Sequence, residues 1–188
     1  MFPQESTVTL TTTHSADTLE IGTIHLLEGG AIGMTRCPGK RRDREVCEAR
    51  DVQADLVALS GWGATAVVTL NQEGELESLG VRDLGKAVQA AGMRWLHLPI
   101  GDMAAPDRPW EEGWKDIGPR VHQWLQAGER VVFHCGGGQG RAGTIAALTL
   151  IERGLASEDA IREVRLARPG AIESIDQERY LLNHPRPT

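Results

Sequence analysis

The sequence predicts an α/β fold, a single domain in which a mostly parallel central sheet carries helices on both faces. Short apolar segments alternate along the chain with segments whose apolar residues recur at helical spacing, which is typical of parallel strands joined by helical crossovers. Residues 64–70 form a continuous apolar run, as in a strand that is buried on both faces. The length of 188 residues suits one domain, and the sequence contains no internal repeat or dividing linker.

The first 18 residues are polar and rich in threonine, and we expect a loose N-terminal arm over 1–18 before a folded domain over 19–188. Strands are predicted where apolar residues alternate or run together. These segments are 19–26, 31–34, 64–70, 94–100 and 130–134.

Helices are predicted where apolar residues are three and four positions apart, and most of these segments end at a glycine. The predicted helices cover 46–59, 81–91, 114–125 and 145–151, one that starts at Ser157 and stops before 168–170, and one over 174–182. Pro119 predicts a kink or a restart in the third of them. Ser157 and Ser174 are the predicted N-caps of the last two.

The composition excludes several classes of function. Twenty basic against 26 acidic residues give a net charge of −6, which argues against a general nucleic-acid binder. Three cysteines are too few for a disulfide framework in a chain of this length. Residues 1–6 lack the basic and apolar regions of a secretory signal, and no apolar stretch reaches transmembrane length. We therefore expect a cytoplasmic protein without a membrane or nucleic-acid partner.

The chemistry concentrates in residues 131–144, which predict a short buried strand, a glycine-rich turn and the first turn of a helix. Cys135 ends the strand, and Arg141 follows after five intervening residues. The turn consists of Gly136, Gly137, Gly138, Gln139 and Gly140. Glycines let successive N–H groups point inward, and together with a helix N-terminus they form an anion cradle.

The same positive environment favours a thiolate at Cys135. Arg141 can donate two parallel hydrogen bonds to an oxyanion. A phosphate held in this cradle would present its phosphorus to the sulfur. The implied reaction is phosphoryl transfer to Cys135, followed by hydrolysis of the thiophosphate.

His134-Cys135-x5-Arg141 resembles the signature of the cysteine-based protein phosphatases, the protein-tyrosine and dual-specificity enzymes. A weaker likeness to the cyclin-dependent-kinase-associated type extends over most of residues 30–182. The resemblance implies a cysteinyl-phosphate intermediate, no cofactor and no metal, and a His134 ring that holds the cradle backbone. One residue departs from the pattern, because Ala142 replaces a Ser or Thr whose hydroxyl helps the thiolate to leave.

Two further site residues follow from the chemistry and from the resemblance. The leaving oxygen needs a proton donor, which in the family is an Asp about thirty residues before the cysteine. Asp102 fits best, Asp107 is its rival, and both could instead be loop or capping carboxylates. Gln177 resembles the Gln that positions the hydrolytic water, but Ser174-x-x-Gln177 equally fits a helix capping box. Both roles stay open.

The cradle contains no basic residue, which favours a singly phosphorylated substrate, and a compact chain favours dual specificity toward phosphorylated proteins or peptides. Two alternatives remain, a catalytically weak phosphate-binding module and a rhodanese-like sulfur transferase. The oligomeric state stays unknown.

Two other clusters of residues stand out in the sequence. The basic turn over 35–44 is either a solvated surface or a site, with Arg41 and Arg42, that reads acidic groups near the phosphorylated residue. Cys37 and Cys47 are either small buried hydrophobes or, for one of them, a reversible disulfide partner of Cys135.

Overall fold

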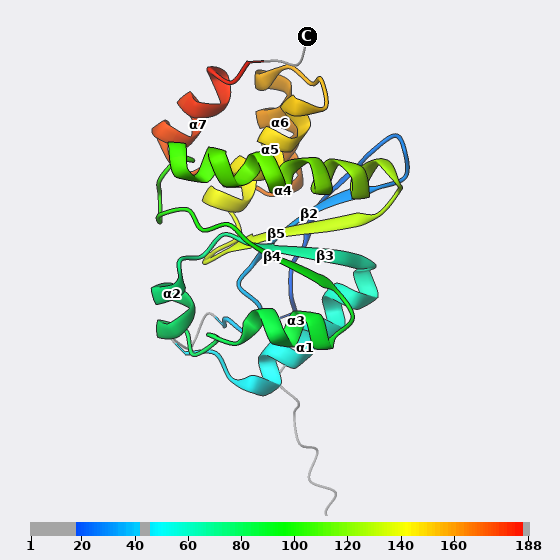
Figure 1. Cartoon of the computed structure of the whole chain (residues 1–188), viewed down its shortest axis with the longest axis vertical. Helices are drawn as coiled ribbons and strands as arrows, with labels where there is room; N and C mark the ends of the chain where they lie inside the picture. The colour runs from blue at the N-terminus through cyan, green and yellow to red at the C-terminus, as the bar shows by residue number, and fades with distance from the viewer. Residues whose placement is uncertain (1–17, 42–45, 186–188) are drawn as a thin grey trace, which may run out of the picture.

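The computed structural model describes residues 18–41 and 46–185, and the strands of this part form one five-stranded sheet (Figure 1). The strands are β1 (Gly22–His25), β2 (Ala31–Arg36), β3 (Ala64–Thr69), β4 (Arg94–His97) and β5 (Arg130–Cys135). Their order is β1-β2-β5-β3-β4; β1 is antiparallel to β2, and the other neighbours are parallel. The predicted fold class is confirmed. The arm predicted over 1–18 lies outside the described residues except for Thr18.

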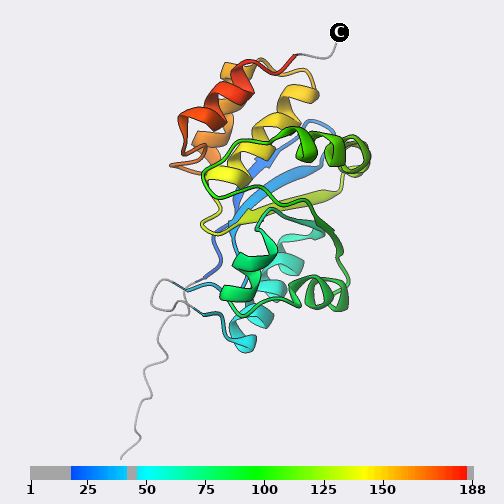
Figure 2. The ribbon, with the colours of Figure 1, turned by 60° about the vertical axis from the view of Figure 1, so that its left-hand side comes forward.

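Helices cover both faces of this sheet, as the alternating pattern predicted. One face carries α4 (Arg108–Gln126), α5 (Gly140–Glu152), α6 (Ser157–Ala167) and α7 (Ile175–Leu182). The opposite face carries α1 (Ala49–Trp62), α2 (Glu73–Ser78) and α3 (Leu84–Ala90). Figure 1 shows the two groups above and below the sheet, and Figure 2 shows the same three layers after a 60° turn.

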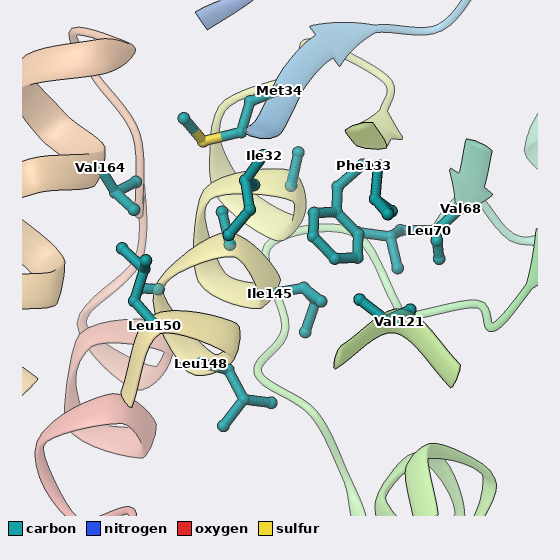
Figure 3. Packing of buried hydrophobic residues seen from close by; sticks show 14 of the residues in the cluster. Ile32, Met34, Val68, Leu70, Val121, Phe133, Ile145, Leu148, Leu150 and Val164 are labelled. Carbon is teal, nitrogen blue, oxygen red and sulfur yellow. The ribbon is translucent and has the colours of Figure 1, made fainter. Parts of the chain in front are cut away.

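The central strand β5 contributes to two hydrophobic cores, one on each face. Val131 and Phe133 belong to the core beneath α4 to α7, and Val132 belongs to the core above α1 to α3. Figure 3 shows Phe133 close to Ile145 of α5, within the larger core. Successive strand side chains point to opposite faces, so the strand that leads to Cys135 is fixed from both sides.

The helix boundaries differ from the prediction where capping overrides the apolar pattern. Helix α4 begins earlier than predicted, because Asp107 Oδ1 accepts the Trp110 N–H at 2.9 Å and caps the helix. It continues through Pro119, so the predicted restart does not occur. Ala156 rather than Ser157 is the N-cap of α6. The predicted cap at Ser174 is confirmed, with its hydroxyl accepting the Gln177 N–H.

Helix α2 was not predicted, although it matters for the site. Of its six residues only Leu76 is buried, so no apolar period marks it. A capping box holds its first turn, in which the Glu75 carboxylate accepts the Gln72 N–H at 2.7 Å. Because α2 directly follows β3, this box brings Glu75 to the carboxyl edge of the sheet.

The carboxyl ends of β2, β3, β4 and β5 meet at one edge of the sheet, where ligands bind in open α/β folds. None of the described helices is long and apolar enough to cross a membrane.

Candidate active site

Residues 135–141, which we term the cysteine loop, connect β5 to α5 at this edge. Cys135 is almost completely buried, and its Sγ accepts the Gly138 N–H at 3.3 Å. Gly138 has a φ of 75°, and a Cβ on it would lie 2.2 Å from the Thr35 carbonyl carbon. Only glycine meets both constraints. The predicted glycine-rich turn therefore brings a backbone N–H to the sulfur, where it stabilises negative charge.

Arg141 is the most constrained cation of the site, with 3% of its side chain exposed. Its Nη1 donates to Glu75 Oε2 at 2.6 Å and to the Ile100 carbonyl at 3.0 Å, and its Nη2 donates to Glu75 Oε1 at 2.8 Å. Arg141 Nε is buried and has no hydrogen-bond partner within the described parts of the chain. Glu75 thus fixes the outer edge of the guanidinium and leaves Nε for another acceptor.

Glu75 is a site residue that the sequence did not predict. Burial alone would raise the pKa of its carboxyl group, but hydrogen bonds from Arg141 and from the Gln72 N–H bring that pKa below its usual value. Asn71 Nδ2 donates to the same carboxylate at 3.2 Å. Glu75 is therefore a charged partner of Arg141 at neutral pH.

The two candidate acids are in different environments. Asp102 Oδ1 lies 3.0 Å from Arg141 Nη2, and 75% of its side chain is exposed. Asp107 caps α4 instead, through its hydrogen bond to the Trp110 N–H. The structure thus brings Asp102 to Arg141 and gives Asp107 a capping role.

His134 is fully buried, with its Nε2 2.7 Å from Thr69 Oγ1. Burial lowers the pKa of His134 to about 3, against the opposing effect of a hydrogen bond with the Cys135 backbone. The ring is therefore neutral at pH 7. A neutral ring at this position can orient the start of the cysteine loop but supplies no charge.

Gln177 is buried and joins three segments. Its Oε1 accepts the N–H groups of Glu173 and Ser174 at 3.0 and 3.3 Å, which confirms the capping box. Its Nε2 donates to the Ala104 carbonyl at 3.1 Å and so ties α7 to the loop that carries Asp102. A Cβ on Gly140 would lie 3.2 Å from this Nε2. The proposed role in positioning water stays a prediction.

Glu173 is a second residue that the sequence did not reveal. Its Oε2 accepts the Gly140 N–H at 2.7 Å, at the first residue of α5. Gly140 was predicted to donate this N–H to a phosphate. A bound phosphate would therefore compete with the Glu173 carboxylate for one donor of the loop.

The basic turn is only partly available to a ligand. Arg41 is buried and donates to Asp55 at 2.7 Å, and Arg36 Nη2 lies 3.8 Å from the same carboxylate. Arg41 is therefore held by Asp55, but it also lines a cavity beside Gly136 and Gly137, so its role in reading the substrate stays a prediction. Arg42 and Arg44 lie outside the described residues.

All three cysteines are free thiols in this structure. Burial raises the pKa of the Cys37 thiol far above its usual value and also raises that of Cys47. Both thus have the character of small buried hydrophobes. A disulfide with Cys135 stays a prediction.

Comparison with known proteins places this site in a family. Residues 44–181 match the profile of the Swiss Army Knife PTP domain, described as a DSP-PTPase phosphatase domain. The chain is 32% identical to mouse cyclin-dependent kinase inhibitor 3 over 136 residues, covering 70% of this chain and 62% of that protein. It is 40% identical to human protein tyrosine phosphatase type IVA 3 over 77 residues, covering 36% and 44%. The chain thus spans less than two thirds of these relatives.

Solved structures agree with this assignment. A kinase-associated phosphatase, with its catalytic-site cysteine replaced by serine, superposes with a TM-score of 0.75 at 28% identity, covering 88% of this chain and 93% of that one. The active form of Tk-PTP superposes with a TM-score of 0.59 at 27% identity, covering 82% and 92%. The chain therefore belongs to the family of cysteine-based dual-specificity protein phosphatases.

Proposed function

We propose that this protein hydrolyses phosphotyrosine, and also phosphoserine and phosphothreonine, monoesters in proteins through a cysteinyl-phosphate intermediate. The observation that carries the proposal is the meeting of three groups at one edge of the sheet. Cys135 Sγ receives a backbone N–H, Arg141 is held by Glu75, and Asp102 lies 3.0 Å from that arginine. A nucleophile, an oxyanion donor and a proton donor are what phosphoryl transfer to sulfur requires.

In the first step the Cys135 thiolate attacks phosphorus, so that the S–P bond forms and the ester P–O bond breaks. Asp102 gives its proton to the departing oxygen. Arg141 donates from Nε and Nη2 to the equatorial oxygens, and N–H groups of the cysteine loop share the developing charge. The Gly140 N–H takes part only when the phosphate displaces the Glu173 carboxylate. Glu75 keeps the guanidinium aligned while this happens.

In the second step the Asp102 carboxylate accepts a proton from water, which attacks phosphorus. The S–P bond breaks, inorganic phosphate leaves, and the Gly138 N–H stabilises the returning thiolate. Gln177 is the residue proposed to orient that water. Ala142 is fully buried in the larger core and offers no hydroxyl to the leaving sulfur, so we expect this step to limit turnover.

The test is metal-free turnover of a small aryl phosphate and of a phosphotyrosine peptide. We expect Cys135→Ser to abolish both activities. Asp102→Ala should reduce kcat on the peptide by about 10²-fold or more, and by less on the aryl phosphate, whose leaving group needs little protonation. Asp107→Ala is the matched control, because it removes the α4 cap and leaves the site carboxylate in place.

A catalytically weak phosphate-binding module is the second candidate, and Ala142 is the observation that favours it. A burst of one equivalent of product followed by slow turnover would mean that hydrolysis of the intermediate is limiting. Binding of phosphopeptide without any burst would favour the module and overturn the catalytic roles.

A further inference from the structure

Three side chains on neighbouring strands form a hydrogen-bonded chain that ends at the His134 ring. Trp95 lies on β4, Thr69 is the last residue of β3, and His134 lies opposite Thr69 where β3 pairs with β5. The Trp95 Nε1–H donates to Thr69 Oγ1 at 2.8 Å, and Thr69 Oγ1 lies 2.7 Å from His134 Nε2. The contacts therefore cross the sheet from β4 to the residue next to Cys135.

This chain of side chains is buried and its first member is held in one orientation. Thr69 and His134 are both fully buried. The Trp95 ring packs against the core on the side of α1 to α3, where a Cβ on Gly85 would lie 2.6 Å from Trp95 Cδ2. His97 stacks on the same ring, with the two centroids 5.4 Å apart. The direction of the Trp95 N–H is therefore fixed by the packing of α3 and β4.

The hydrogen-bonding capacity of these groups determines where each proton lies. An indole N–H only donates, whereas a hydroxyl offers one proton and two lone pairs. Thr69 Oγ1 accepts from Trp95, and among the described residues its own proton has only His134 Nε2 as an acceptor. A proton on Nε2 would leave the buried Thr69 hydroxyl proton without an acceptor, which costs free energy. The neutral His134 ring should therefore accept at Nε2 and carry its proton on Nδ1.

The second nitrogen of the ring lies on the side of the cysteine loop. Nδ1 of His134 is buried, and no hydrogen bond of ordinary geometry satisfies it within the described residues. The ring also interacts with the Cys135 backbone, and this interaction opposes the effect of burial on the pKa of His134. Because Thr69 occupies Nε2, the interaction falls to Nδ1. An N–H at this position favours negative charge nearby, whereas a lone pair would oppose it.

We propose that Thr69 and Trp95 are positioning residues, which hold the His134 ring with its proton on Nδ1 and so favour the Cys135 thiolate. The inference rests on the proposed function, because it concerns the nucleophile of that reaction. Both residues act through His134, and neither belongs to the cysteine loop that would hold the phosphate.

Other titratable or charged groups also face Cys135 and His134, and the variants below leave all of them in place. They come from α5, α2, β4 and the segments after β2 and β4, and they are Arg141, Glu75, His97, Cys37, Lys40 and Asp102.

The first test reads the tautomer of His134 directly. Long-range ¹H–¹⁵N correlation spectra distinguish a protonated ring nitrogen from one that accepts a hydrogen bond, and comparison with His134→Gln assigns the signals. Wild type should carry the proton on Nδ1, and Thr69→Ser should retain it there. Thr69→Val and Trp95→Phe should each show a mixture of the two tautomers, because the proton of Nε2 is then no longer excluded. A proton on Nε2 in wild type would overturn the proposal.

The second test is the pH dependence of the alkylation of Cys135 by iodoacetamide, with the modified residue located by mass spectrometry. Only the thiolate reacts, so the midpoint pH measures how well the protein stabilises negative charge on the sulfur. Thr69→Val should raise this midpoint by about one pH unit, Trp95→Phe should raise it by less, and Thr69→Ser should leave it near the wild-type value.

Thr65→Val is the matched control, because the Thr65 hydroxyl also bridges β3 and β5, through the Arg130 carbonyl at 3.2 Å. It should leave the midpoint unchanged, since a loss of stability alone does not move it. An unchanged midpoint in both Thr69→Val and Trp95→Phe, or an equal shift in Thr65→Val, would overturn the proposal. If Thr69→Val does not fold, Trp95→Phe decides, because it keeps the hydroxyl and an aromatic ring.

Neither test needs turnover, so the proposed function fails separately from this inference. Wild type that hydrolyses no phosphopeptide would overturn the proposed function. The positioning roles of Thr69 and Trp95 would still stand if their variants move the tautomer of His134 and the alkylation midpoint of Cys135 as expected.

Discussion

The Arg141–Glu75 pair explains how one arginine can be both fixed and available. A guanidinium carries five N–H donors in a rigid plane. Glu75 takes one donor from each of Nη1 and Nη2, and the Ile100 carbonyl takes a second one from Nη1. Nε has no partner among the described residues, and Asp102 Oδ1 lies 3.0 Å from Nη2. An oxyanion bound at the Nε–Nη2 edge would therefore replace Asp102 at Nη2, while Glu75 continues to orient the guanidinium from its other edge.

Glu75→Gln should therefore lower kcat/KM by about 10- to 100-fold, because the guanidinium loses its charged bidentate partner and its fixed orientation. Steady-state kinetics on an aryl phosphate would measure this. Glu77→Gln is the matched control on the same helix, since Glu77 is largely exposed and pairs with Arg82 rather than with Arg141. Equal activity of the two variants would show that Arg141 needs no carboxylate to hold it.

The lowered pKa of His134 should make the free energy of unfolding depend on pH. Its pKa falls from 6.5 to about 3 on folding, so the unfolded chain binds a proton that the folded chain excludes. The stabilisation is complete above pH 6.5 and is lost as the pH falls toward 3, with a slope of about 1.4 kcal/mol per pH unit from this residue.

Denaturant unfolding of wild type and of His134→Gln at several pH values between about 4 and 6 would measure that slope. In the variant, the number of protons taken up on unfolding should fall by roughly one, whatever the free energy of unfolding at pH 7. His25→Gln is the control, because His25 is exposed. An unchanged slope in His134→Gln would show that other groups cause the loss of stability at acid pH.

At the scale of elements, the close packing of β2 against the cysteine loop depends on Gly138. A methyl group there would meet the Thr35 backbone at 2.2 Å and would also require a φ of 75°. We expect Gly138→Ala to lower the free energy of unfolding by about 2–4 kcal/mol, measured by denaturant titration. Gly137→Ala is the matched comparison, because its Cβ would meet nothing nearer than Gln139 Oε1 at 3.8 Å. Equal losses in both variants would contradict this account.

The sequence predicted best those elements whose own residues are mostly apolar and buried. Strand β5 and helix α5 are almost entirely buried, and their apolar runs flank a recognisable turn. Helix α2 escaped prediction because a capping box and a single buried leucine hold it. The start of α4 was placed too late, because Asp107 caps the helix, a role that was only one of the alternatives considered for this residue.

At the scale of the whole molecule, the predicted site residues are those with a recognisable local sequence pattern, and the missed ones have none. The nucleophile, the arginine and the candidate acid follow strands, and parallel strands place their carboxyl ends together. Glu75 contacts Arg141 across 66 positions, and Glu173 contacts Gly140 across 33. Neither contact produces a local pattern in the sequence. Each forms only when connections of different length bring distant residues to the same carboxyl edge of the sheet.

The sheet also makes the two cores depend on each other, since β3 and β5 send alternate side chains into both. We expect Leu59→Ala, on α1, and Leu148→Ala, on α5, each to cost about 2–5 kcal/mol. Both leucines are fully buried on opposite faces. Because neither core can open without exposing β5, both variants should speed hydrogen exchange in residues 130–141 to a similar degree. Exchange that rises there in Leu148→Ala alone would show that the layer of α1 to α3 unfolds independently of the cysteine loop.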